Sequence, residues 1–111
     1  TLDGPTLVRW VESGRIARTT WEHADFGLPR IPARALRVSG PAESAARIRD
    51  LLGGEPGPVR DLVLANSAAA LRVAGAVEAL PEGVDRAAQA IDSGAAGRLL
   101  ERWRQLTSSS A

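Results

Sequence analysis

Two side chains near the start of the chain are of types that could act as a base or bind a metal. His23 is the single histidine and stands between Glu22 and Asp25, while Asp3 could serve as a metal-binding carboxylate. Neither has a companion nearby in sequence. No second ligand or nucleophile follows His23, and Asp3 is followed by Gly-Pro, which is typical of a turn. We therefore interpret His23 as a solvated loop histidine and Asp3 as a turn residue.

A glycine-rich stretch could approach a phosphate. The segment "GGEPGPVRD" precedes an expected helix start, where backbone N–H groups can hold an anion. Asp61 places a negative charge in that first turn, and the Gly-Lys-Ser/Thr signature of a phosphate-binding loop is missing. We interpret the stretch as a connector.

Asn66 lies in the middle of "VRDLVLANSAAALRVAG", a helical pattern that is apolar on almost every side. It could contact a ligand, but a buried asparagine more often bonds the backbone of a neighbouring loop or helix. We expect this packing role. The tryptophans Trp10, Trp21 and Trp103 are far apart and are expected to pack in cores. The residues therefore identify no catalytic, substrate-binding or metal-binding side chain.

Composition excludes several classes of function. The 111 residues suffice for one domain, and 14 basic residues, all arginine, are scattered among 13 acidic ones. This distribution does not indicate a nucleic-acid partner. No run is long and apolar enough for a membrane span, the first residues do not resemble a signal peptide, and cysteine is absent. We expect a soluble, cytoplasmic protein without disulfides or thiolate chemistry.

The first third of the chain predicts strands. Residues 6–12 and 15–21 flank Ser13-Gly14 and are expected to form a β-hairpin. Residues 22–35 are expected to form a loop, and residues 33–39 are expected to form a third strand.

After Gly40 the pattern predicts four helices. Prolines at positions 41, 58 and 81 suit first helical turns, which gives helices over residues 41–52, 58–79 and 81–91. Ser93 is expected to cap a fourth helix ending near residue 106. The second helix is too apolar to be covered by three short companions. Together with the absence of methionine, this leads us to expect a fragment of a longer protein whose missing part covers that helix.

Several blocks of the sequence resemble the C-terminal part of the anthranilate phosphoribosyltransferases, the tryptophan-pathway members of glycosyltransferase family 3. The blocks are "LDGPTLV", "DFGL", "GEPGPVRDLVLANSAAALRVAG" and "EGVDRAAQAIDSGAAGRLLERW", in the family's order. The chain departs from the family at His23-Ala24, where Pro-Glu is usual, and at Ala95, where lysine is common.

The resemblance implies an α/β fold of the nucleoside phosphorylase/phosphoribosyltransferase type. Residues 1–111 would form the C-terminal part of its α/β domain, with strands over residues 6–39 on one side of a mostly parallel sheet and helices over residues 41–106. The N-terminal helical domain and the glycine-rich phosphate loop would lie upstream of Thr1.

The resemblance also implies the transfer of phosphoribosyl from phosphoribosyl pyrophosphate to anthranilate, with release of pyrophosphate. The enzyme would use Mg²⁺ and form a cytoplasmic homodimer without nucleic-acid or membrane partners. The Mg²⁺ ligands and the catalytic groups would lie upstream of this chain, which is expected to be inactive alone. Two alternatives stay open. They are a stand-alone helical interaction module and a fragment of a related pyrimidine nucleoside phosphorylase.

Overall fold

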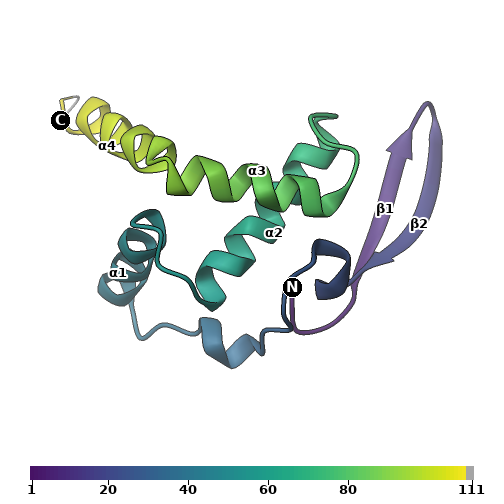
Figure 1. The fold of residues 1–111 in the computed structure, drawn as a ribbon, viewed down its shortest axis with the longest axis horizontal. Helices are drawn as coiled ribbons and strands as arrows, with labels where there is room; N and C mark the ends of the chain where they lie inside the picture. Colours follow the sequence, from purple (N-terminus) through teal and green to yellow (C-terminus); the bar gives the residue numbers. More distant parts are fainter. Residues whose placement is uncertain (110–111) are drawn as a thin grey trace.

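Prolines and glycines set most helix boundaries in the computed structural model, which describes residues 1–109 (Figure 1). Three of the four helices carry proline in their first two positions, where the missing N–H loses no helical hydrogen bond. The helices are α1 (Pro41–Leu52), α2 (Pro58–Val73), α3 (Leu80–Asp92) and α4 (Ala95–Ser108). The predicted hairpin followed by four helices is confirmed.

Two predicted boundaries were wrong. The second helix ends at Val73 rather than near residue 79, because Gly75 has a positive φ of 73° and the Ala76 N–H bonds back to the Leu71 carbonyl. Gly94, rather than Ser93, occupies the N-cap of α4. The Ser93 hydroxyl still accepts a hydrogen bond from the Ala95 N–H at 3.3 Å.

The hairpin consists of β1 (Thr6–Glu12) and β2 (Arg15–Trp21), paired antiparallel from Thr6↔Trp21 to Glu12↔Arg15. Its turn has Ser13 at φ 50° and Gly14 at φ 74°. Positive φ at both central residues is the type I′ geometry, whose twist matches that of the two strands.

The predicted third strand over residues 33–39 was wrong. Ala33–Leu36 form a short 3₁₀ helix, η2, which starts after Pro32 and closes with the Arg37 N–H on the Arg34 carbonyl. A second 3₁₀ helix, η1 (His23–Phe26), lies within the expected loop. The sheet formed by residues 1–109 thus has two strands.

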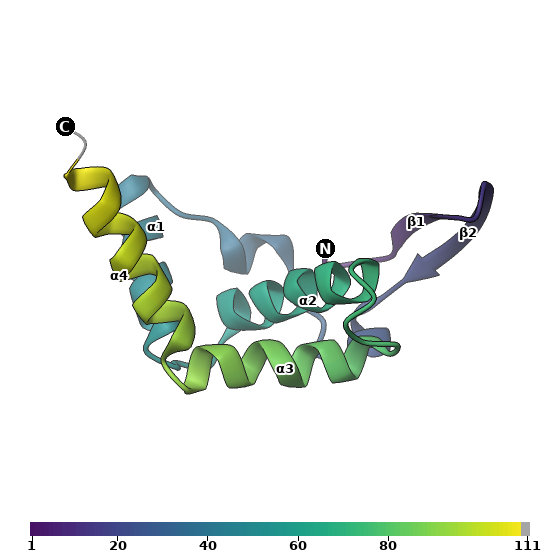
Figure 2. The same ribbon diagram turned by 90° about the horizontal axis from the view of Figure 1, so that it is seen from above.

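The core lies where α2 crosses α3, with the segments around η1 packed beneath (Figures 1 and 2). Its buried residues are Leu2, Phe26, Ile31, Leu51, Leu64, Ala65, Ala68, Leu80, Val84, Ala87 and Ile91. Ala68 of α2 is fully buried. A Cβ added to Gly83 of α3 would lie 2.8 Å from the Cα of Ala68. The two helices therefore approach to a distance at which α3 tolerates only glycine.

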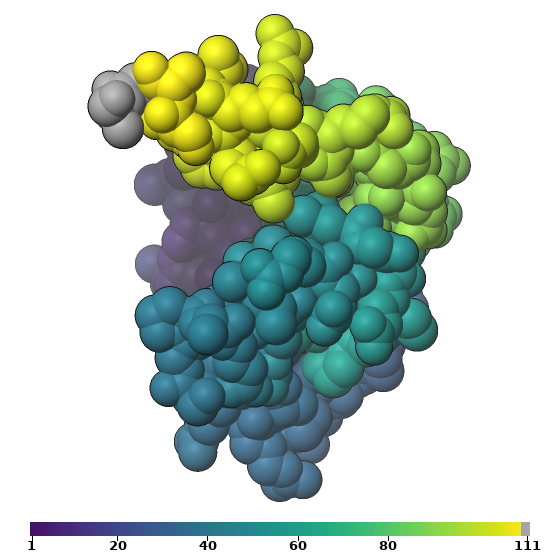
Figure 3. Space-filling model, turned by 90° about the vertical axis from the view of Figure 1, so that its left-hand side faces the viewer, coloured from purple at the N-terminus to yellow at the C-terminus, as the bar shows by residue number. Residues whose placement is uncertain are grey.

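Two elements extend away from this core. Figure 2 shows the hairpin at one end of the molecule and α4 turning away from α3 at the other. On the face shown in Figure 3, α4 lies above α1, and a hollow of about 590 Å³ is lined by both helices. Large apolar side chains on these elements stay exposed, among them Val11, Leu99 and Trp103. The expectation that Trp103 packs in a core was wrong for this chain, because α4 has no neighbour on that side among residues 1–109.

Two glycine substitutions, one at the α2–α3 contact and one outside it, should change the free energy of unfolding in opposite directions. Gly83→Ala should lower the free energy of unfolding by about 1 to 3 kcal/mol, because the new methyl group would overlap the backbone of Ala68. Gly97→Ala in α4 meets no atom within 4 Å and should stabilise by up to about 1 kcal/mol. Urea unfolding followed by circular dichroism measures both. A neutral or stabilising Gly83→Ala would contradict the described contact.

Candidate functional site

The first residues of the chain are held against residues 30–33. The Leu2 carbonyl accepts a hydrogen bond from the Ile31 N–H at 3.1 Å. One carboxylate oxygen of Asp3 accepts bonds from Arg30 Nη2 and Nε at 2.9 and 3.2 Å, and the other accepts the Ala33 N–H at 3.0 Å. Because both oxygens are engaged, Asp3 acts as a structural clamp.

The electrostatics of Asp3 agree with that role. The Ala33 N–H, followed by the Arg30 guanidinium, lowers the pKa of the Asp3 carboxyl below its usual range. The clamp is therefore made by the ionised form of Asp3.

His23 is tied to the backbone rather than solvated. Its ring is half-buried, and Nδ1 lies 2.9 Å from the Leu28 carbonyl oxygen, to which it donates when it carries the proton. Gly27, at φ 70°, turns the chain so that this carbonyl returns to the ring. The prediction of a solvated histidine was wrong because the local η1 turn could not be read from the loop composition.

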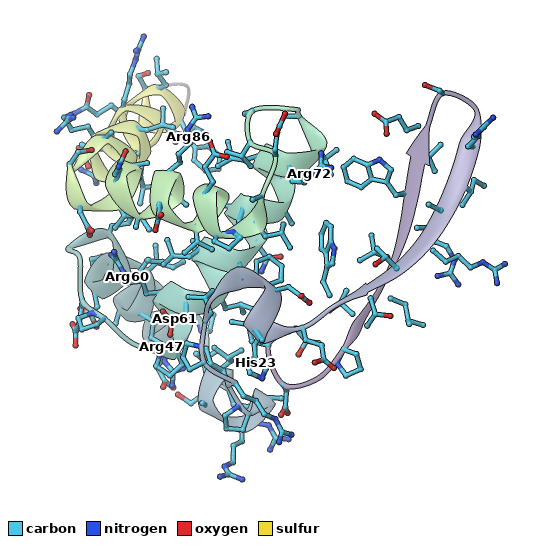
Figure 4. All side chains as sticks on the ribbon, turned by 45° about the vertical axis from the view of Figure 1, so that its right-hand side comes forward. His23, Arg47, Arg60, Asp61, Arg72 and Arg86 are labelled. Carbon is cyan, nitrogen blue, oxygen red and sulfur yellow. The ribbon has the colours of Figure 1, made fainter. Side chains whose placement is uncertain are left out.

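The glycine-rich connector lines a cleft of about 290 Å³ between η2, α1 and the start of α2. Two arginines face this cleft (Figure 4). Arg47 donates to the Ala35 carbonyl and to Glu43, at 3.0 and 2.9 Å, while Arg60 forms two bonds with Asp92 at 2.8 and 2.9 Å. Both guanidinium groups are thus already paired with carboxylates.

The charge balance of the cleft opposes phosphate binding. Asp50 and Glu55 place two acidic groups on its walls. An anion at the start of α2 would therefore meet neutralised arginines and additional carboxylates, which supports our interpretation of a connector.

Asn66 does not bond a neighbouring element within residues 1–109. Its side chain is exposed, and Nδ2 donates to the Leu62 carbonyl of the same helix at 2.9 Å. It borders a cavity of about 140 Å³ between α2 and the hairpin, together with Thr6 and Trp21. Within residues 1–109 the expected tie to adjoining backbone is not formed, because the amide is paired with the backbone of its own helix.

Two contacts that sequence patterns did not predict attach loops and strands to the helices. The guanidinium of Arg72 (labelled in Figure 4), at the end of α2, lies 4.6 Å from the centre of the Trp10 ring in β1, a cation–π geometry. Arg86 Nη1 of α3 donates to the Ala76 carbonyl at 2.8 Å. The partners are distant in sequence or joined by a loop, so periodicity contained no signal for either pair.

Neither a metal site nor a membrane span is formed by residues 1–109. No group of three or more His, Cys, Asp or Glu side chains is placed to hold an ion. None of the helices in this part of the chain combines the length and the apolar character needed to cross a bilayer.

Known proteins resemble this chain in sequence and in structure. The sequence profile described as "Glycosyl transferase family, a/b domain" matches residues 1–97. An anthranilate phosphoribosyltransferase of Rhodopirellula baltica is 54% identical over 95 residues, which make up 86% of this chain and 28% of that protein. A second, from Hyphomonas neptunium, is 50% identical over 99 residues, or 89% of this chain and 29% of that protein.

Among solved structures, the crystal structure of anthranilate phosphoribosyltransferase from Thermus thermophilus matches with a TM-score of 0.74 and 41% identity. The match covers 86% of this chain and 29% of that one. The similarity confirms the expected α/β class. The chain spans less than a third of the length of these relatives.

The Asp3 clamp predicts a pH-dependent effect of Asp3→Asn. Since folding lowers the pKa of this carboxyl, its contribution is present above about pH 4 and is lost as the pH falls through the folded-state value. Asp3→Asn should therefore lower the melting temperature at pH 7 more than at pH 3. Asp85→Asn is the control, because Asp85 is exposed on α3 and has no side-chain partner among residues 1–109. An equal loss at both pH values would contradict the charged clamp.

Proposed function

Because the chain belongs to the glycosyl transferase family through its a/b domain, we propose that it forms part of an anthranilate phosphoribosyltransferase. The observation that carries this proposal is 54% identity to such an enzyme over 86% of the chain. The structural match to the Thermus thermophilus enzyme, at a TM-score of 0.74, also supports it.

The reaction joins the anthranilate nitrogen to C1 of the ribose. The amine attacks C1 as the bond from C1 to the pyrophosphate oxygen breaks, pyrophosphate leaves with the electron pair, and the amine loses a proton. C1 becomes cation-like and negative charge develops on the leaving group, so the site must hold the amine in line and offer donors to pyrophosphate. Residues 1–109 contain no carboxylate cluster that fits Mg²⁺, and we assign the metal ligands and the catalytic groups to protein outside this sequence.

Within that enzyme, we assign residues 1–111 to the C-terminal part of the α/β domain. The N-terminal helical domain and the glycine-rich phosphate loop would lie outside this sequence. Two findings support the assignment. The chain spans less than a third of its relatives, and apolar side chains of the hairpin, α2 and α4 are exposed as expected for surfaces that other protein covers.

The same proposal includes a cytoplasmic homodimer that acts on small molecules rather than on nucleic acid. The near-neutral net charge of +1 and the scattered arginines support the part of this proposal that concerns nucleic acid.

A chimera tests whether this chain can serve in the reaction. The aligned segment of the Thermus thermophilus enzyme is replaced by this chain, and loss of anthranilate fluorescence is followed in the presence of phosphoribosyl pyrophosphate and Mg²⁺. We expect kcat/KM within about tenfold of the parent, equivalent to about 1.4 kcal/mol in transition-state stabilisation. The 111-residue chain alone is the control and should show neither turnover nor saturable binding of phosphoribosyl pyrophosphate by calorimetry.

Two results would overturn the proposal. One is a chimera that melts as cooperatively as the parent enzyme and yet has no activity with anthranilate. The other is an isolated chain that binds phosphoribosyl pyrophosphate saturably, because the binding groups would then lie within residues 1–111.

A further inference from the structure

The sequence places an aspartate directly before a glycine at one position, Asp3-Gly4. This pair is the setting in which aspartate isomerises most readily to isoaspartate, because glycine has no Cβ to hinder attack by its backbone nitrogen. The other aspartates are followed by residues that carry a side chain, and they are Asp25, Asp50, Asp61, Asp85 and Asp92. The chemistry of the pair therefore involves groups that this chain itself supplies.

Isoaspartate forms through a cyclic succinimide. The backbone nitrogen of Gly4 attacks Cγ of Asp3, this nitrogen loses its proton, and a carboxyl oxygen leaves as water. Water then reopens the ring. Its attack at the Cγ carbonyl restores aspartate, whereas its attack at the α-carbonyl leaves a main chain that runs through Cβ and Cγ. The water released in the first step balances the water used in the second, so the reaction needs no other reagent.

The attack requires rotations in both the side chain and the backbone of Asp3, and one guanidinium restrains both. Arg30 Nε donates to the backbone carbonyl of Asp3 at 2.9 Å, and Arg30 Nη2 donates to the carboxylate oxygen Oδ1 at 2.9 Å. The Ala33 N–H holds the second carboxylate oxygen at 3.0 Å. Because these bonds fix the carboxylate and the following peptide relative to each other, Cγ and the Gly4 nitrogen cannot turn toward each other while the clamp is closed.

We propose that Asp3-Gly4 is a site of isoaspartate formation and that the Arg30 clamp keeps it unreacted in the folded chain. The bonds to the carboxylate act in a second way. A carboxylate is a poorer electrophile than the neutral acid, and the Ala33 N–H and the Arg30 guanidinium lower the pKa of the Asp3 carboxyl. The clamp thus opposes the reaction through geometry first and through ionisation as well.

The product cannot remake the clamp. Once the main chain runs through Cγ, this carbon keeps a single oxygen, and the carboxylate that bonded both Arg30 and Ala33 no longer exists. The additional backbone atom also lies next to Leu2, which is 1% exposed in the core and whose carbonyl accepts the Ile31 N–H. Isoaspartate at position 3 would therefore release the N-terminal segment from residues 30–33.

Peptide mapping of the 111-residue chain after incubation in neutral buffer tests the proposal. Trypsin releases residues 1–9, whose isoaspartyl form has the same mass as the parent peptide and is separated from it by chromatography. The synthetic peptide of residues 1–9 lacks the clamp and should form isoaspartate at least about tenfold faster than the folded chain, because several hydrogen bonds to a charged group must open in the latter. Arg30→Ala should raise the rate in the folded chain by about three- to tenfold, since it removes the forked pair and leaves the bond from Ala33.

Three controls separate the clamp from the general stability of the chain. Arg37→Ala removes another exposed arginine of the same region and should leave the rate unchanged. Deamidation at Asn66-Ser67 reports opening of α2, because the Ser67 nitrogen lies within that helix, and it should not increase in Arg30→Ala. Gly4→Ala, whose new Cβ meets no atom within 4 Å, should suppress isoaspartate in the Arg30→Ala background.

The proposal is overturned if the folded chain forms isoaspartate as fast as the peptide, or if Arg30→Ala and the unsubstituted chain react at equal rates. A parallel increase in deamidation of Asn66 would assign the protection to the fold as a whole and overturn it as well. So would a peptide that forms no isoaspartate, because the pair would then be unreactive. None of these results depends on transferase activity, so the proposed reaction is judged separately.

Discussion

The structure depends on the close approach of α2 and α3. Gly83 meets the backbone of Ala68 where the two helices cross, and the buried side chains of both helices gather around this point. Close packing of this kind makes dispersion contacts along the whole crossing, and any side chain at position 83 would separate the helices. Residues of η1, of α1 and of the N-terminal segment complete the core on either side of the pair.

The remaining elements are attached to this pair by a few directional contacts. Asp3 and Arg30 hold the N-terminal segment, Arg60 and Asp92 join α2 to the end of α3, and Arg72 holds the hairpin through Trp10. Little apolar area backs the hairpin or α4, so their outer side chains stay in water. A chain with one tight centre and uncovered apolar margins is what we expect of a segment that packs within a larger domain.

Local signals in the sequence predicted the elements well where one residue type controls the backbone. Proline placed the starts of α1, α2 and α3 to within one residue, and Ser13-Gly14 placed the hairpin turn. The third strand failed because alternating residues after Pro32 suit a short 3₁₀ turn equally well, and a strand needs a partner that periodicity does not identify.

The candidate site shows the same contrast between features that local sequence controls and features that depend on a partner in space. The glycine-rich stretch was interpreted as a connector because Asp61, which is evident from the sequence, places a negative charge at the start of the following helix. The structure agrees with that interpretation, since the arginines beside the stretch are paired with carboxylates. The roles of Asn66 and His23 depended on which groups lay beside them in space. Asn66 turned out to bond its own helix and His23 a carbonyl from the following turn. The contact of Arg72 with Trp10 depends on tertiary packing alone.

Native-state hydrogen exchange of the 111-residue chain tests the central role of the α2–α3 crossing most directly. The most protected amides should lie in residues 64–68 of α2 and 84–91 of α3, with protection at least about 100-fold above that of β1, β2 and the second half of α4. Hairpin or α4 amides as protected as those at the crossing, or uniformly low protection along the chain, would contradict this account.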